Sequence, residues 1–260
     1  MKRTRIFPPL TDFPSQFWDF VRDTPIYDSS CSAQARVYYL DRDEGLYLKT
    51  APKGTLSQEA AMTRFFHEKG LAAQVLTYLQ ADADWLLTTR VPGEDCIHEN
   101  YLADPKRLCE TTAALLRMLH DTPAEGCPID RTADYLRTAR LCFENATYEQ
   151  DLFPDNWGYR TPEEAWAVVQ SFTPELKSDT LIHGDYCLPN IMLDNWTFSG
   201  FIDLGSSGLG DKHIDLFWGT WTLQFNLHTD RWCDHFLDAY GRENFNPDIL
   251  KAIAAFEVFG

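Results

Sequence analysis

Three polar residues set among short apolar runs constrain this chain more than any other feature. Asp185 is preceded by His-Gly and followed five residues later by Asn190, and Asp203 stands thirteen residues further on in an Ile-Asp-Leu-Gly sequence. The apolar runs are Thr180–His183, Ile191–Leu193 and Phe198–Ile202. Short runs bounded by polar turns predict strand, loop and strand, so we expect the polar residues at strand ends.

Carboxylate and carboxamide oxygens in this order indicate phosphoryl transfer. Magnesium prefers such ligands, and it neutralises the negative charge that a transferring phosphoryl group spreads over its oxygens. The catalytic loop of protein kinases carries an aspartate that accepts the hydroxyl proton, an asparagine five residues on, and a later metal-binding aspartate. Asp185 and Asn190 alone could form an ordinary polar turn. The preceding His-Gly, the apolar flanks and Asp203 favour a phosphoryl-transfer centre instead.

The composition is that of a globular protein. The chain has 260 residues, of which 44% are hydrophobic and 14% aromatic, enough for a full core in one or two lobes. No apolar run approaches the roughly 18 residues of a membrane span, and the first residues lack the apolar segment of a signal peptide. We therefore expect a cytoplasmic protein without a membrane partner.

Seven cysteines without any Cys-x-x-Cys pair argue against a disulfide framework or a zinc site. They stand at positions 31, 96, 109, 127, 142, 187 and 233. We expect reduced, buried thiols, with Cys187 packed rather than nucleophilic. Cys233 and His235, on either side of an aspartate, provide too few ligands for zinc.

The formal net charge of −16 excludes some partners. Nucleic acids and anionic membrane surfaces would be repelled, whereas a cationic ligand would be attracted. The acidic balance could also serve solubility alone, and it becomes informative only when a substrate class is suspected on other grounds.

The first part of the chain is predicted as a small lobe of strands with one helix. The predicted strands are Val37–Leu40, Gly45–Lys49, Val75–Leu79 and Trp85–Thr89. The first two flank a charged turn and predict a hairpin. Residues Ser57–Lys69 have helical spacing of apolar positions and end at Gly70.

The remainder is predicted to be mainly helical, which makes the fold class α+β. The predicted helices are Pro105–His120, Thr132–Asn145, Pro162–Ser171, Ile214–Leu227, Arg231–Tyr240 and Pro247–Phe259. We place the division at residues 91/92, with a nucleotide-binding N-lobe over 1–91 and a catalytic, substrate-binding C-lobe over 92–260. A cleft between lobes is a common place for a nucleotide.

Lys49 and Glu59 fit a second part of a phosphoryl-transfer site. In protein kinases a strand lysine contacts the phosphates of the nucleotide and is held by a glutamate of the next helix. Lys49 ends an apolar strand, and Glu59 lies in the first turns of the predicted helix. The alternatives are an exposed charge at a strand end and a plain acidic residue at a helix start.

Five segments together resemble the aminoglycoside 3'-phosphotransferases over essentially the whole chain. They are residues 45–49, 115–120, 183–190, 199–205 and 210–215. The resemblance implies the protein-kinase-like bilobal fold, with a β-rich N-lobe containing one helix and a mainly helical C-lobe. It also implies Mg²⁺ as cofactor and ATP or GTP as phosphoryl donor.

The resemblance implies roles for the residues already singled out. Asp185 would be the catalytic base, Asn190 and Asp203 the magnesium ligands, and Lys49 the phosphate-binding lysine with Glu59 beside it. His183 would be a packed residue that shapes the loop rather than an acid or base.

Further residues take roles only from the resemblance. The backbone of Arg90 and Val91 would meet the adenine. In the nucleotide-binding loop, relatives carry a serine two residues before the alanine that matches Ala35. Here Ala33 occupies that place, and Ser32, one position away, is the candidate for binding the nucleotide. Asp215 resembles the structural aspartate of the family near the start of a helix, where a carboxylate is favoured.

The predicted acceptor pocket departs from the family pattern. Relatives place an arginine just after the Asp-x-Gly glycine, and an arginine followed by acids along the next helix, where this chain has Ser206, Trp221, Phe225 and Asn226. The remaining candidates for contact with a cationic acceptor are Asp155, Asn226 and Glu257. An aromatic stripe of Trp218, Trp221 and Phe225 at helical spacing is more typical of a core than of a pocket.

Other motifs are excluded by their surroundings. The glycine-rich sequence after Asp203 has no Gly-Lys-Ser/Thr step of a P-loop and opens no dinucleotide-binding unit. The chain contains no Gly-x-Ser-x-Gly of a hydrolase.

We therefore predict a Mg²⁺- and nucleotide-dependent kinase of a small molecule, acting on the 3'-hydroxyl of an aminoglycoside. One alternative is a kinase of the same fold with a different hydroxylated acceptor, which the altered pocket residues support. Another is a nucleotide-binding protein without turnover, against which the presence of Lys49, Asp185, Asn190 and Asp203 argues.

Overall fold

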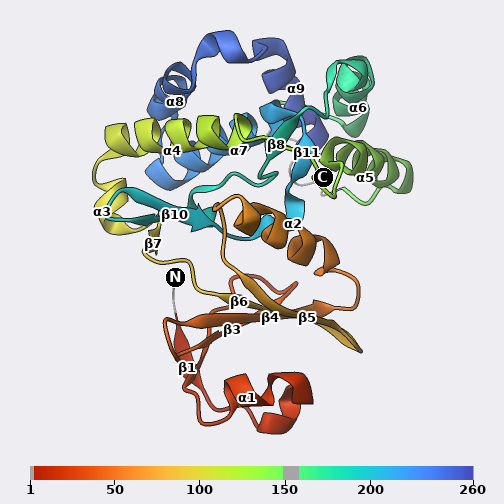
Figure 1. Cartoon of the computed structure of the whole chain (residues 1–260). Helices are drawn as coiled ribbons and strands as arrows, with labels where there is room; N and C mark the ends of the chain where they lie inside the picture. Colours follow the sequence, from red (N-terminus) through yellow and green to blue (C-terminus); the bar gives the residue numbers. More distant parts are fainter. Residues whose placement is uncertain (1–2, 149–157, 260) are drawn as a thin grey trace. The chain divides into compact units, whose positions relative to one another are not determined.

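A computed structural model describes residues 3–148 and 158–259 (Figure 1). The chain forms two compact units, and the boundary between them is crossed three times. Residues 1–95 and 191–205 make the first unit, and residues 96–190 and 206–260 make the second. The segments 92–95 and 191–205 thus belong with the first unit, whereas the division expected from sequence placed them in the C-lobe.

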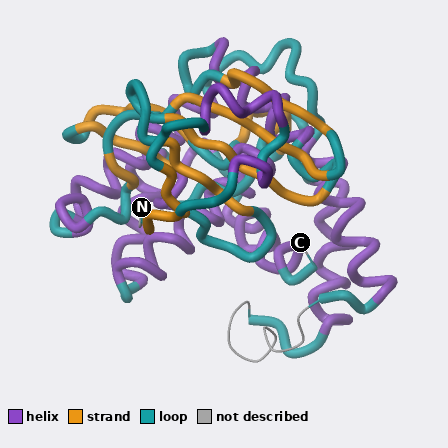
Figure 2. Tube along the Cα trace, turned by 90° about the horizontal axis from the view of Figure 1, so that it is seen from below, coloured by secondary structure: helices purple, strands orange, loops and turns teal. Residues whose placement is uncertain are grey.

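A six-stranded antiparallel sheet is the main element of the first unit, and Figure 2 shows its strands side by side. The strands follow the order β1-β2-β3-β4-β6-β5. Their bounds are Thr4–Ile6 (β1), Ile26–Asp28 (β2), Arg36–Leu40 (β3), Leu46–Pro52 (β4), Val75–Gln80 (β5) and Ala83–Thr89 (β6). The hairpin predicted around residues 41–44 is confirmed, with Leu40 paired to Leu46.

The helix predicted from Ser57 is confirmed as α2 (Ser57–Glu68), one residue shorter than expected. It ends before Gly70, whose φ of +73° is a conformation that glycine adopts without steric cost. Its buried face carries Phe66 and also Glu59. Burying a carboxylate on an apolar helix face requires a partner, and this places Glu59 in the site described below.

The N-terminal elements were not predicted. They comprise β1, β2, two 3-10 turns (Leu10–Asp12 and Ser15–Phe17) and α1 (Trp18–Val21). Each is too short to show periodicity, yet they supply Phe13 and Phe17, which pack against Trp85 in the core of the first unit.

The three strands predicted around the polar residues are confirmed. They are β8 (Thr180–Ile182), β9 (Ile191–Asp194) and β10 (Thr197–Phe201). In the first unit β9 pairs with β10 and with β7 (Glu94–Asp95). In the second unit β8 pairs with β11 (Gly208–Gly210), which the sequence analysis missed.

The second unit consists mainly of helices. Their bounds are Glu99–Leu102 (α3), Pro105–His120 (α4), Arg131–Asn145 (α5), Pro162–Phe172 (α6), Lys212–Leu227 (α7), Cys233–Tyr240 (α8) and Pro247–Glu257 (α9). The start predicted at Arg231 was wrong, because a 3-10 turn over Asp230–Trp232 precedes α8. Helices α4 and α7 lie side by side in Figure 1 and are in contact.

Local sequence explains several helix starts. Helices α4, α6 and α9 each begin with a proline, which needs no backbone donor at that position. The preceding Asp104, Thr161 and Asn246 accept hydrogen bonds from backbone N–H groups of the first turn. The core of this unit includes Tyr135 of α5 stacked on Phe256 of α9.

All seven cysteines are free thiols, but the expectation that they are buried holds for only three. Cys96, Cys109 and Cys187 are buried, Cys31 is exposed, and the other three are intermediate. Among the residues that the structure describes, no helix is both long and apolar enough to cross a membrane.

Two glycines with similar backbone conformations differ in their surroundings and make a matched pair. A Cβ atom on Gly93 (φ +87°) would lie 2.1 Å from the Leu193 carbonyl oxygen, whereas one on Gly54 (φ +89°) would meet nothing within 4 Å. In both alanine variants a residue with a Cβ atom must adopt the left-handed backbone conformation, which costs free energy. Only in Gly93→Ala does the new Cβ also force the chain away from β9. We expect Gly93→Ala to lose roughly 2–5 kcal/mol of unfolding free energy and Gly54→Ala about 1 kcal/mol.

Urea denaturation of both variants measures this difference. Equal losses would show that the close approach of Gly93 to β9 does not constrain the fold.

Candidate active site

A lysine and two carboxylates meet inside the first unit. Lys49 Nζ of β4 lies 2.8 Å from Glu59 Oε2 of α2 and 2.8 Å from Asp203 Oδ1, which follows β10. The structure therefore brings together three residues separated by up to 154 positions in sequence. The prediction that Glu59 faces Lys49 is confirmed, and neither residue is a plain surface charge.

Burial and neighbouring charges shift the pKa values of Lys49 and Glu59 in opposite directions. Burial alone would lower the pKa of the Lys49 ammonium, but the negative charges of Glu59 and Asp203 outweigh it, and the pKa lies above its usual value. Burial raises the pKa of Glu59, although Lys49 opposes that rise. Lys49 is thus held as a fixed cation, the form that can attract a phosphate.

Asp203 is held in an unusual backbone conformation. Its φ is +59°, in the left-handed region that few residues other than glycine adopt. Strain of this kind costs on the order of 1–3 kcal/mol and concentrates at functional sites. The side chain is 53% exposed although one oxygen is paired with Lys49, so the carboxylate can still reach a ligand.

The predicted catalytic loop forms a compact turn in the second unit. Asn190 Nδ2 donates to the backbone oxygen of Asp185 at 3.0 Å and to its carboxylate at 2.9 Å. Of residues 183–190, only Asp185 and Pro189 are not buried. The loop therefore presents one carboxylate in a fixed orientation, which is the arrangement a general base requires.

A buried carboxylate holds this loop from behind. Asp215 of α7, fully buried, accepts hydrogen bonds from the backbone N–H groups of His183 (2.8 Å) and Gly184 (2.7 Å). Gly184 has a φ of +79°, and a Cβ there would lie 1.9 Å from the Ser206 carbonyl oxygen. The His-Gly step before Asp185 thus requires glycine for both conformation and space.

His183 is buried, as predicted for a packed residue. A second histidine, His120 at the end of α4, extends the network. Its Nε2 lies 3.2 Å from Asp215, and its Nδ1 lies 2.8 Å from the hydroxyl of Tyr240 in α8. Sequence reasoning missed this role of His120 and Tyr240. The matching segment 115–120 was the available signal for His120, whereas nothing in the sequence singled out Tyr240.

Cys187 lies inside the catalytic loop. It is buried, and burial together with the neighbouring Asp185 charge raises the pKa of its thiol well above the usual range. The prediction of a packed rather than nucleophilic cysteine agrees with this environment.

The donor atoms of Asn190 and Asp203 suit magnesium. Asn190 uses its amide nitrogen on Asp185, which leaves its carbonyl oxygen as the atom that can act as a ligand. Among the described residues, no three His, Cys, Asp or Glu side chains gather as a metal site. A metal held by few protein oxygens needs further oxygens from its surroundings, and this is the way magnesium binds together with phosphates.

The remaining residues predicted to bind the nucleotide lie in the first unit. Ser32 is exposed on the segment between β2 and β3. Arg90 follows β6, and its backbone N–H already donates to the Gly45 carbonyl at 3.0 Å. Val91 is buried. The proposed contacts of these residues with a nucleotide stay predictions.

Of the residues predicted to contact the acceptor, Asp155 lies outside the described residues. Asn226 of α7 donates its amide to the backbone oxygen of Thr222 at 2.8 Å and to the Thr222 hydroxyl at 3.1 Å. Glu257 of α9 accepts from the Tyr135 hydroxyl at 2.7 Å. Burial raises the pKa of Glu257 to about 7, partly opposed by the hydrogen bond from Tyr135.

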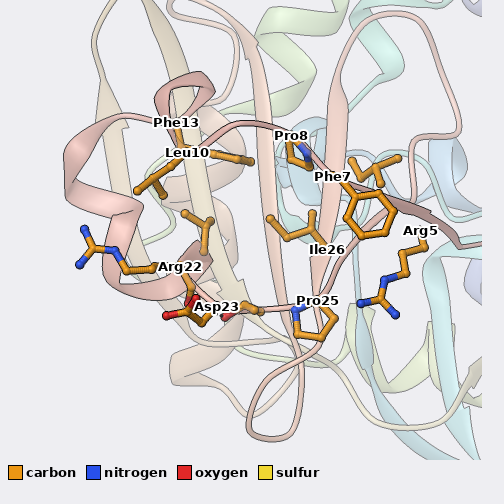
Figure 3. Close-up of a pocket in the computed structure, with 12 residues that line it drawn as sticks. Arg5, Phe7, Pro8, Leu10, Phe13, Arg22, Asp23, Pro25 and Ile26 are labelled. Carbon is orange, nitrogen blue, oxygen red and sulfur yellow. Dashed lines mark hydrogen bonds between the residues drawn. The ribbon is translucent and has the colours of Figure 1, made fainter.

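Two cavities are lined by residues other than the predicted site residues. A cavity of about 390 Å³ in the first unit is lined by β1, β2 and the turns between them, with Arg5 and Arg22 at its rim (Figure 3). A second, of about 440 Å³ in the second unit, is lined by residues that include Phe217 and Leu250. Neither contains a predicted site residue.

The raised pKa of the Glu257 carboxyl makes the stability of the protein depend on pH. Its pKa is about 7 in the folded protein and 4.5 in the absence of the fold, so between these values the unfolded state binds fewer protons. Stability conferred by neutral Glu257 is therefore lost as the pH rises. Relative to the wild type, we expect Glu257→Gln to gain roughly 1–3 kcal/mol of unfolding free energy between pH 5 and pH 8.

Denaturation at both pH values tests this expectation, with the exposed Glu163→Gln as control. A difference between Glu257→Gln and wild type that stays constant with pH would contradict it.

Known proteins resemble this chain in sequence and in fold. The chain matches the phosphotransferase enzyme family, APH, over residues 32–253. A probable aminoglycoside 3'-phosphotransferase of Lactococcus lactis subsp. lactis is 46% identical over 255 residues, which cover 96% of each chain.

Solved structures show the same fold. An aminoglycoside 3'-phosphotransferase of type VIII has a TM-score of 0.72 and 24% identity, covering 90% of this chain and 91% of its own. An aminoglycoside phosphotransferase from Streptomyces rimosus, in complex with ADP and streptomycin, has a TM-score of 0.71 and 24% identity, with 86% and 90% covered. Because the family match spans most of the sequence and the Lactococcus relative nearly all of it, the chain belongs to the aminoglycoside 3'-phosphotransferases of the phosphotransferase enzyme family.

Proposed function

We propose that this protein transfers the γ-phosphoryl group of ATP or GTP to a hydroxyl of an aminoglycoside, the 3'-hydroxyl. One observation carries the proposal: the Asp185 carboxylate is presented by a mostly buried loop and is oriented by Asn190 at 2.9 Å. A carboxylate so fixed can accept the proton of an acceptor hydroxyl as that oxygen attacks phosphorus.

The Lys49 group of the first unit supports binding of the donor. Lys49 is a cation held by two carboxylates, and it would contact the phosphates of the nucleotide. Asp203 and Asn190 would hold Mg²⁺, which when bound neutralises charge on the phosphoryl group. With the Arg90 N–H paired to Gly45, we expect other backbone groups of this segment, those of Val91 included, to meet the base.

The charge of the protein supports a cationic acceptor. An excess of 16 negative charges attracts polycationic aminoglycosides, over about 8 Å at physiological salt. The Lactococcus relative carries the name of this activity, and the Streptomyces neighbour was solved with an aminoglycoside bound.

A second acceptor class has one observation in its favour. Where relatives carry charged residues this chain has Ser206, Trp221, Phe225 and Asn226, so a kinase of another hydroxylated small molecule is the alternative. A nucleotide-binding protein without turnover is disfavoured because Lys49, Glu59 and Asp203 are assembled and Asp185 is oriented.

Acceptor specificity can be tested directly. We expect Mg²⁺-dependent nucleotide consumption with kanamycin and none with tobramycin, which lacks the 3'-hydroxyl. ATP and GTP are each supplied, and product is detected by mass. Equal turnover of both antibiotics would exclude the 3'-hydroxyl as the required acceptor, and turnover of neither would favour a different acceptor.

The role of Asp185 can be tested by substitution. Asp185→Asn preserves shape and can still accept from Asn190, but it removes the base. We expect kcat to fall on the order of 10²- to 10⁴-fold while Mg·nucleotide affinity changes little. Asp121→Asn, at an exposed carboxyl after α4, is the control. A wild-type kcat in the Asp185→Asn variant would show that Asp185 is not the catalytic base.

A further inference from the structure

A buried carboxylate lies beside the segment that joins the strand of Lys49 to the helix of Glu59. Asp84 of β6 has no exposed surface. Its Oδ2 accepts hydrogen bonds from the backbone N–H of Leu56 at 2.9 Å and from the Tyr78 hydroxyl at 3.0 Å. Leu56 is the residue immediately before α2. The carboxylate therefore connects the sheet to the start of the helix.

The register of the sheet places Asp84 on the face that α2 covers (Figure 1). Asp84 pairs across the sheet with Ala51, and Leu86 pairs with Lys49. Paired residues, and residues two apart in a strand, have their side chains on the same face, so all four share one face. On that face Leu86 belongs to an apolar cluster with Ala60 of α2. Apolar packing thus holds the helix against the sheet, and Asp84 fixes where the helix begins.

Helix α2 has no capping side chain of its own. Its N-cap residue is Leu56, whose side chain cannot accept a hydrogen bond from the first turn. The carboxylate of Asp84 accepts the N–H of this residue from a strand that follows 28 positions later. It also places negative charge near the N-terminus of the helix, where the helix dipole favours it. The start of α2 is therefore positioned by a residue outside the helix.

The charge of Asp84 is buried without a cationic partner. Among the described residues no lysine, arginine or histidine side chain pairs with it, and its Oδ1 accepts no hydrogen bond. Burial would raise the pKa of Asp84, but the neighbouring backbone N–H groups of Gly54 and Leu56 outweigh it, and the pKa lies below its usual value. A buried charge of this kind is costly for folding, and the contact that it makes in return is with the start of α2.

We propose that Asp84 is a positioning residue for phosphoryl transfer, which fixes the start of α2 and through that helix holds Glu59 beside Lys49. Glu59 lies three residues after Leu56, so a shift of the first turn moves its carboxylate away from the Lys49 ammonium, 2.8 Å distant. The inference rests on the proposed role of Lys49 in binding the phosphates of the nucleotide. Asp84 has no exposed surface and acts only through Glu59, so its effect is expected in nucleotide affinity.

Substitution of Asp84 tests the inference. We expect Asp84→Ala to raise the Kd of Mg·ADP and the KM of the nucleotide donor about 5- to 50-fold, with the KM of kanamycin near its wild-type value. In Asp84→Asn the carboxamide oxygen can still accept from Leu56, so the Kd should lie closer to that of the wild type. The Kd is measured by calorimetry without an acceptor, so the reading does not depend on turnover.

A double-mutant cycle with Glu59→Gln separates positioning from a general loss of stability. If Asp84 acts through Glu59, Asp84→Ala should raise the Kd less than about 2-fold in the Glu59→Gln background. A residue that only stabilises the fold would change the Kd by the same factor in both backgrounds.

The control for lost stability is Val21→Ala. Val21 is buried in the core that contains Leu87, on the other face of the sheet, and its truncation should lower the Tm but leave the Kd of Mg·ADP unchanged. Thermal unfolding of each variant confirms the fold. If Asp84→Ala does not fold, Asp84→Ser, whose shorter side chain does not reach Leu56, takes its place in the cycle.

The outcomes separate this inference from the proposed function. An unchanged Kd in Asp84→Ala, equal factors in the two backgrounds, or a loss in Asp84→Asn as large as in Asp84→Ala would each overturn the positioning role and leave the phosphotransferase proposal intact. An unchanged Kd in Glu59→Gln alone would contradict the role of Glu59 in holding Lys49, and the inference with it. A wild type that binds no nucleotide would overturn both proposals.

Discussion

The buried carboxylate of Asp215 is the contact on which the catalytic loop depends. It accepts hydrogen bonds from two backbone N–H groups of the loop, and the imidazole of His120 lies 3.2 Å from it. Hydrogen bonds to a buried charged group contribute about 1.5–3 kcal/mol each, so this one side chain outweighs most other contacts of the loop. Because Asp215 belongs to α7, the position of Asp185 follows from the packing of a helix rather than from the loop itself.

The order of the chain explains how Asp203 comes to face Lys49. After the catalytic loop the backbone returns to the first unit as β9 and β10, and the latter ends two residues before Asp203. The hairpin is held by β7 and by the close approach of Gly93 to Leu193. The first unit therefore contains a complete lysine–carboxylate group, although Asp203 lies 154 positions from Lys49 in the sequence.

Local patterns in the sequence were sufficient to predict much of this structure. The hairpin of β3 and β4, helix α2 and the strands around Asp185 have clear periodicity or turn residues. The resemblance of five short segments to aminoglycoside 3'-phosphotransferases was confirmed by the family match. The pairing of Lys49 with Glu59 could be predicted because strand and helix are adjacent in the chain.

Other features depend on contacts that local sequence does not contain. Tyr240 joins the network behind the loop only because α8 packs on α4. Glu257 has a raised pKa because Tyr135 and the surrounding core enclose it, and its own neighbours in sequence give no sign of this. The N-terminal strands were missed since three residues show no period. The assignment of the aromatic stripe to a core was wrong for Phe225, which is 60% exposed, because helical spacing fixes a side of the helix but not what covers it.

The hydrogen bonds of Asn190 explain why the residue five positions after Asp185 is an amide. Its side-chain nitrogen donates to the backbone oxygen and to the carboxylate of Asp185, and an amide, unlike an ammonium or guanidinium group, also has an oxygen that can act as a ligand. An aspartate in this place would set two like charges side by side, and the pair would then share one proton near neutral pH. The amide of Asn190 thus orients the Asp185 carboxylate without adding a second negative charge to the loop.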